Sequence, residues 1–141
     1  RGLQERFGRQ VSVNLCFSAD LANLVYAASD LYLMPSKSEP CGLSQLMAMR
    51  FGAVPVVNAT GGLKDTVPAY EGPESEGRGF TFQSYNADDF LAAIDRALAL
   101  YYDAPAQWQE LVRHDMSQDF GWDKGAERYM ALYHKALGDK A

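Results

Sequence analysis

The chain has 141 residues and a net charge of −5, and 48% of its residues are apolar and 12% aromatic. This length and composition predict one globular domain with a hydrophobic core, and they exclude an intrinsically disordered chain. Because the sequence has no cluster of Lys or Arg, its acidic balance argues against nucleic acid or an anionic membrane surface as a partner. No apolar run in the sequence approaches the roughly 18 residues of a membrane span, so no membrane partner is expected.

The first elements form a helix end, a strand and a second helix. The opening residues, RGLQERFG, have the character of a helix end, and the chain does not begin with Met, so we expect a piece of a longer protein. Residues 11–17 (VSVNLCF) are β-branched and apolar, which predicts a strand. Ser18 is a suitable N-cap for a helix over residues 19–29, where apolar residues recur at helical spacing.

A second and a third strand follow, with a helix between them. Residues 31–34 predict a short strand ended by Pro35, and residues 43–51 (LSQLMAMRF) predict a helix ended by Gly52. Residues 54–57 (VPVV) predict the next strand. Alternating strands and helices with continuously apolar strands are typical of a buried parallel sheet. We therefore predict an α/β fold in which residues 11–17, 31–34 and 54–57 form adjacent parallel strands.

The remainder of the chain is predicted to be mainly helical. A loop rich in Gly and Glu over residues 71–79 leads to the sequence GFTF, and three helical segments close the chain. Pro105 lies near the start of the second of these helices, where proline is tolerated. Because three strands make a thin sheet, residues 1–141 are interpreted as a single domain that is the second half of a doubly wound, three-layer domain.

The two cysteines lie in different settings. Cys16 is in the first predicted strand and Cys41 is in a turn, and neither belongs to a CxxC pair. This usage is typical of a reduced, cytoplasmic protein. We therefore expect free thiols, no metal site and no cofactor.

The residues most suited to a binding site lie between the strand over residues 31–34 and the helix over residues 43–51. In open parallel sheets, ligands bind beyond the carboxyl ends of the strands, where loops lead into helices. Gly42 leaves the backbone uncovered, and the amides of Leu43, Ser44 and Gln45 are free at the helix start. With the helix dipole, these amides form an anion site that needs no lysine, so a diphosphate is a suitable ligand.

Glu39 precedes this helix start and would repel a phosphate if it pointed at it. A carboxylate beside the phosphates can instead accept hydrogen bonds from the hydroxyls of an attached neutral group, and a sugar is the obvious candidate. The alternative is that Glu39 only caps its own loop or the helix start, and local features favour both interpretations about equally. Thr60, Gly61 and Gly62 could form a second backbone donor loop, although a tight strand-to-helix turn requires the same residues.

Three stretches resemble one enzyme family. They are FSADLANLVYAASDLYLMP, the directly following SKSEPCGLSQLMAMRFGAVPVVNATGGLKDTV, and MSQDFGWDKGAERYMALYHKAL near the end. These stretches strongly resemble bacterial glycogen synthases and plant starch synthases, and the resemblance is weakest over residues 71–79. It implies a retaining glucosyltransferase of the GT-B fold, which has two Rossmann-like domains with a cleft between them. This chain would be the latter part of the donor-binding C-terminal domain.

The resemblance also implies roles for individual residues. Glu39 matches the family glutamate that contacts the glucosyl hydroxyls of ADP-glucose, and we assign it as the catalytic residue. Cys41 and Gly42 match the turn whose backbone approaches that sugar. Leu43 and Ser44 match the helix start that donates to the diphosphate, where the family more often has Thr at the second position.

Two further positions bear on the nucleotide. Phe17 falls where the family commonly has a Tyr that stacks on adenine, and a Phe ring can stack equally well. Related retaining transferases have a second glutamate eight residues after the first, whereas this chain has Met47 there. Glycogen and starch synthases also lack that second glutamate, so Met47 favours the synthases.

The implied function is transfer of glucose from ADP-glucose to the non-reducing end of an α-1,4-glucan, with retention, in the cytoplasm or, for a plant protein, the plastid. The implied partners are these two substrates and an N-terminal domain of the same polypeptide, without which we expect no activity. One alternative is another GT-B glycosyltransferase that uses a UDP- or GDP-sugar, against which Met47 and Phe17 argue. The other is a non-catalytic glucan-binding module, which would usually carry exposed aromatic platforms on strands.

Overall fold

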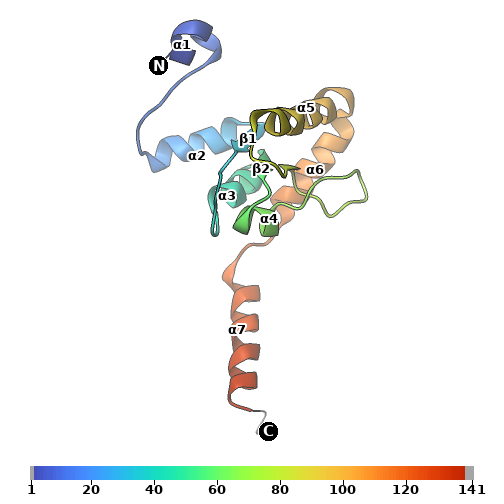
Figure 1. Ribbon diagram of the computed structural model, residues 1–141. Helices are drawn as coiled ribbons and strands as arrows, with labels where there is room; N and C mark the ends of the chain where they lie inside the picture. The colour runs from blue at the N-terminus through green and yellow to red at the C-terminus, as the bar shows by residue number, and fades with distance from the viewer. Residues whose placement is uncertain (1, 139–141) are drawn as a thin grey trace.

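The computed structural model describes residues 2–138 (Figure 1). Its elements, in chain order, are α1 (Gly2–Phe7), a 3₁₀ helix η1 (Gly8–Gln10), α2 (Ala19–Ala28), β1 (Leu31–Met34), α3 (Ser44–Phe51), β2 (Val54–Asn58), α4 (Gly61–Thr66), β3 (Phe80–Phe82), α5 (Ala87–Asp103), α6 (Pro105–Ser117) and α7 (Trp122–Ala136). The strands predicted over residues 31–34 and 54–57 are confirmed, as are the three closing helices. The short helix α4 begins within residues 60–62, where the sequence indicated either a donor loop or a tight strand-to-helix turn.

Local signals in the sequence set the helix ends. The Ser18 hydroxyl oxygen accepts a hydrogen bond from the Leu21 amide at 3.2 Å, which caps α2 as predicted. Gly52 adopts a left-handed conformation with φ 92° and ends α3, also as predicted. Pro105 is the first residue of α6, where its missing N–H group removes no helical hydrogen bond.

The sheet has three parallel strands in the order β1-β2-β3. Leu31 pairs with Val54, and Val56 pairs with Phe80. All five residues of the central strand β2 are buried, which explains why its first four residues, 54–57, are all apolar. The predicted α/β fold with a parallel sheet is confirmed.

Helices cover both faces of the sheet, so the domain has three layers. On one face, Val54 and Val56 pack with Phe80 and Phe82 against buried residues of α5 and α6. On the other face, Val57 packs against α3, against α4 and against the residue that directly follows α4. The helical residues of the first cluster are Ala93, Ala97, Trp108 and Leu111, and those of the second are Met49, Leu63 and Val67.

The strand predicted over residues 11–17 is wrong. These residues form an extended segment that pairs with no strand of the described chain, and Figure 1 shows it running outside the sheet between α1 and α2. Leu15 and Phe17 are 85% and 101% exposed. A β-branched apolar sequence favours extended backbone, but a strand also needs a neighbour for its hydrogen bonds, and β1 pairs only with β2.

The last helix, α7, projects away from the sheet and its covering helices (Figure 1). Its large apolar side chains, Tyr129, Met130, Leu132 and Tyr133, are all more than half exposed. None of the described helices is both long and apolar enough to cross a membrane.

Candidate active site

The three strands are parallel, so their carboxyl ends lie at one edge of the sheet. The loops over residues 35–43, 59–60 and 83–86 leave the sheet at this edge. Asn58, at the end of β2, is buried, and its side-chain Nδ2 donates to the Ser36 carbonyl oxygen at 2.9 Å. This bond ties the β1–α3 loop, which contains the predicted site, to the central strand.

A buried glycine makes the turn into α3. Gly42 has φ 72°, a left-handed conformation that favours glycine, and a Cβ there would lie 2.6 Å from Gln45 Oε1. Glu39 is half-buried, whereas Cys41 and Leu43 are exposed on the outer side of the turn. Within the described residues the Glu39 carboxylate accepts no hydrogen bond, so the structure offers no support for a cap on its own loop.

The start of α3 has unused donors. No hydrogen bond between described residues uses the amides of Leu43, Ser44 or Gln45. The Ser44 hydroxyl contacts the Met34 sulfur at 3.3 Å, which is a weak acceptor. Eight residues of helix behind these amides add the positive end of the helix dipole, so this position suits an anion.

The first turn of α4 packs against the back of the 39–42 turn. The Gly62 amide donates to the Glu39 carbonyl oxygen at 3.0 Å. A Cβ at Gly61 would collide with that same carbonyl, and a Cβ at Gly62 would collide with the Cys41 carbonyl. The backbone contact therefore accounts for both glycines, and the Gly62 amide is engaged inside the protein. Thr60 is the N-cap of α4, without a side-chain capping bond.

The structure does not bring Phe17 together with the turn. Its ring is fully exposed in the unpaired segment over residues 11–17, before α2. The other predicted residues all lie within the β1–α3 loop, the first residue of α3, and the adjoining start of α4.

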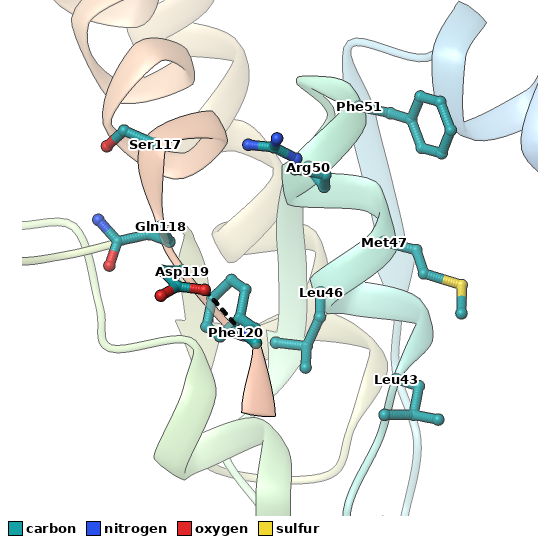
Figure 2. Close-up of a pocket in the computed structure, with 10 residues that line it drawn as sticks. Leu43, Leu46, Met47, Arg50, Phe51, Ser117, Gln118, Asp119 and Phe120 are labelled. Atoms are coloured by element: carbon teal, nitrogen blue, oxygen red, sulfur yellow. Dashed lines mark hydrogen bonds between the residues drawn. The ribbon is translucent and has the colours of Figure 1, made fainter. Parts of the chain in front are cut away.

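A groove of about 610 Å³ opens beside the turn. Figure 2 shows one wall, formed by side chains of α3, facing the segment that links α6 to α7. Met47 belongs to this wall and is 46% exposed, so the groove has an apolar side chain at this position. Its lining residues are Leu43, Leu46, Met47, Arg50, Phe51 and residues 117–121.

Polar contacts fix the far wall of the groove. Arg50 Nη1 donates to the Met116 carbonyl oxygen at 2.6 Å, which joins α3 to the end of α6. Asp119 Oδ1 accepts from the Gly121 amide at 2.8 Å, the bond drawn in Figure 2. The link between α6 and α7 is thereby held in a defined shape next to the predicted site.

One strongly perturbed carboxyl lies on α6. Burial raises the pKa of Asp115 to about 8, and the nearby Arg78 guanidinium opposes this shift. Both carboxyl oxygens of Asp115 and Nε of Arg78 are buried, and none of the three atoms has a hydrogen-bond partner within residues 2–138. Because it is buried beneath the surface of α6, this carboxyl is a factor in stability rather than a candidate for contact with substrate.

Sequence reasoning missed the side chain of Gln45. This residue is fully buried on the first turn of α3, and its side-chain Nε2 donates to the Gly42 carbonyl oxygen at 2.9 Å. The available signal was a carboxamide in the stretch LSQLMAM, where all other residues except Ser44 are apolar, since an uncharged polar residue in a buried helix normally has a specific partner.

Comparison with known proteins identifies the family of this chain. The family model of glycosyl transferases group 1 matches residues 9–115. The match covers more than half of the chain, and the chain belongs to this family.

More specific similarities are to glycogen and starch synthases. The chain is 49% identical to the glycogen synthase of Clostridium botulinum (strain Alaska E43 / Type E3) over 93% of its length, and 46% identical to that of Kosmotoga olearia over 97%. It spans only 27% and 29% of these two curated relatives.

Two solved structures, of a starch synthase and of a sucrose-phosphate synthase, are also similar to this chain. The catalytic domain of starch synthase IV from Arabidopsis thaliana, bound to ADP and acarbose, matches 96% of this chain with a TM-score of 0.86 and 37% identity. A sucrose-phosphate synthase from Thermosynechococcus elongatus matches 99% of the chain with a TM-score of 0.67 and 26% identity. The chain spans 29% and 34% of these two structures.

Proposed function

We propose that this chain is the latter part of the donor-binding C-terminal domain of an ADP-glucose-dependent glycogen or starch synthase. The complete enzyme transfers glucose from ADP-glucose to the non-reducing end of an α-1,4-glucan and retains the anomeric configuration. The observation that carries the proposal is the identity of 46–49% with glycogen synthases over nearly the whole chain. The starch synthase neighbour, which is bound to ADP and acarbose, supports the same donor and acceptor classes.

In this proposal the residues of the turn divide the donor between them. The Glu39 carboxylate accepts hydrogen bonds from the glucosyl hydroxyls, and Cys41 and Gly42 let the backbone approach the sugar. The amides of Leu43 and Ser44 bind the diphosphate and stabilise the charge that develops on ADP as it leaves. Two observations on residues 2–138 support this division: the carboxylate accepts no hydrogen bond from them, and none of their hydrogen bonds uses the helix-start amides.

The proposed reaction needs no protein nucleophile. The leaving diphosphate assists the incoming acceptor hydroxyl on the same face of the sugar, so the protein contributes orientation and electrostatic stabilisation. Phe17 stacks on adenine only when the segment over residues 11–17 is placed by other parts of the longer polypeptide. Those parts also supply the acceptor side of the cleft. The proposed location of the complete enzyme is the cytoplasm or, for a plant protein, a plastid.

The test is an assay of the complete polypeptide that contains this chain, with glycogen as acceptor and ADP-, UDP- or GDP-glucose as donor. We expect transfer chiefly from ADP-glucose, with retention at the new α-1,4 linkage. Preference for UDP- or GDP-glucose would favour another GT-B glycosyltransferase. Binding of glycogen without transfer from any donor would favour a glucan-binding module.

A further inference from the structure

The side chain of Gln45 holds the 39–42 turn from behind. It is fully buried, and its Nε2 donates both to the Gly42 carbonyl oxygen at 2.9 Å and to Thr66 Oγ1 at 3.0 Å. Gly42 belongs to the turn, whereas Thr66 is the last residue of α4. One carboxamide therefore connects the turn to a helix 21 residues further along the chain.

The connection continues back to Glu39. The Thr66 hydroxyl donates to the Gly62 carbonyl oxygen at 2.6 Å, and the Gly62 amide donates to the Glu39 carbonyl oxygen at 3.0 Å. The two ends of the turn are thus held by the same two side chains and by the first turn of α4. The series of bonds runs from Glu39 through Gly62, Thr66 and Gln45 to Gly42.

The orientation of the carboxamide is determined by its partners. The Gly42 carbonyl can only accept a hydrogen bond, so the side-chain nitrogen must face it. Among the described residues, this orientation leaves Oε1 of Gln45 buried without a partner, close to the Gly42 backbone. The carboxamide is therefore held by its two donor bonds alone, to Gly42 and to Thr66.

We propose that Gln45 is a positioning residue, which fixes the turn carrying Glu39 relative to the start of α3 through the carbonyl of Gly42. This inference rests on the proposed function of the turn. The carboxylate on the turn and the amides at the helix start address two parts of one donor, so their spacing must be fixed for transfer. Because α3 keeps its own amides without Gln45, loss of the side chain affects turnover more than binding of the nucleotide.

The test uses the complete polypeptide and near-isosteric variants. Gln45→Met keeps the approximate size of the side chain but removes the donor, and we expect kcat with ADP-glucose to fall about 10²-fold, the cost of a small misplacement of a reacting group. Inhibition by ADP should change little. Thr66→Val should also lower kcat, whereas Thr66→Ser, which keeps the hydroxyl, should retain the wild-type kcat. The double variant Gln45→Met/Thr66→Val should be no worse than Gln45→Met alone.

A second measurement reports the turn without any substrate. Hydrogen exchange at the Gly62 amide, which is bonded to Glu39, should be faster in Gln45→Met and in Thr66→Val. The Ala53 amide, bonded to the Ala48 carbonyl at the far end of α3, serves as the control and should not change. Faster exchange at both amides would indicate general destabilisation and would overturn the inference.

The outcomes separate this inference from the proposed function. An active wild-type enzyme whose Gln45→Met variant keeps its kcat would overturn the positioning role and leave the proposed function intact. A wild-type polypeptide that transfers from no sugar nucleotide would overturn the proposed function. In that case, faster exchange confined to Gly62 would still support Gln45 as the residue that holds the turn, and unchanged exchange would overturn it.

Discussion

Glu39 is the residue on which the proposed chemistry depends most directly. Its backbone carbonyl is held by Gly62, yet its carboxylate has no hydrogen-bond partner among the described residues. A half-buried carboxylate with a fixed backbone and no internal partner is well placed to bind hydroxyl groups of a ligand. The helix-start amides, by contrast, are suited to the phosphates.

Substitution of Glu39 should separate these two roles. In the complete polypeptide, Glu39→Ala should lower turnover by orders of magnitude and leave the affinity for ADP nearly intact, because in the proposed function the carboxylate binds the sugar and not the phosphates. Steady-state kinetics with ADP-glucose, together with ADP inhibition, measures both quantities. Glu39→Gln keeps the size of the side chain and tests whether the charge itself is required. Loss of ADP binding with an unchanged rate would contradict the assignment.

Asp115 predicts a pH dependence of stability. Its pKa is raised by burial from 3.8 to about 8 in the folded chain, with Arg78 opposing the shift. Between these two values the folded chain retains a proton that the unfolded chain has released. The free energy of unfolding should therefore fall as the pH rises from about 4 to about 8.

The Asp115→Asn variant should remove this dependence. At pH 8 we expect it to be more stable than the wild type, since the buried carboxylate is gone, and near pH 4 the two should be similar. Urea unfolding over this pH range measures the difference. Asp95→Asn, at an exposed position of α5, is the control and should leave the slope unchanged. A wild-type slope that persists in Asp115→Asn would show that another group is responsible.

At the scale of elements, the contact between α4 and the β1–α3 loop is a close backbone contact. Gly62→Ala introduces a Cβ that collides with the Cys41 carbonyl, and the rigid backbone on both sides cannot easily move away. We expect a loss of stability of about 1–3 kcal/mol, typical of overpacking, together with lower turnover because the turn is displaced. Urea unfolding followed by the fluorescence of buried Trp108 measures the first effect.

Gly125→Ala is the matched control for this substitution. Gly125 lies inside α7, and among the side chains that the structure describes, a Cβ there would meet the Trp122 ring at 3.5 Å, an ordinary contact. Alanine should favour the helix by about 0.5–1 kcal/mol, which circular dichroism would register as higher helicity. If Gly62→Ala proved as harmless as Gly125→Ala, α4 would not be in close contact with the turn.

For the molecule as a whole, the proposed function gives this chain part of a nucleotide site and not all of it. The helix-start amides are available, but the net charge of −5 disfavours an anion at long range, and Phe17 lies outside the site. Binding must also overcome several kcal/mol of lost translational and rotational freedom. We therefore expect the 141-residue chain alone to bind ADP weakly, with a Kd on the order of millimolar. This Kd corresponds to a binding free energy of roughly −4 kcal/mol.

Titration calorimetry with ADP tests this expectation, and an assay with ADP-glucose and glycogen should detect no transfer by the chain alone. The complete polypeptide is the control for both measurements. Micromolar binding or measurable transfer by these 141 residues would mean that the site is more complete than the proposal holds.

Features that depend on residues adjacent in the chain could be predicted from the amino-acid sequence. Ser18, Gly52 and Pro105 mark helix ends through local hydrogen bonds and backbone angles, so they could be predicted without knowledge of the fold. The apolar run over residues 54–57 identified a strand buried on both faces. Glu39, Gly42 and the start of α3 are adjacent in the chain, and for this reason the candidate turn was found from the sequence.

Features that depend on partners distant in the chain required the folded structure. Residues 11–17 have the composition of a strand, but pairing requires a neighbouring strand, and the described chain provides none. The glycines at 61 and 62 suited either a ligand or a tight turn until the carbonyls of Glu39 and Cys41 were found against them. The proposed role of Gln45 depends on its hydrogen bond to Thr66, 21 residues away. The partners of a buried carboxamide are known only once the chain has folded around it.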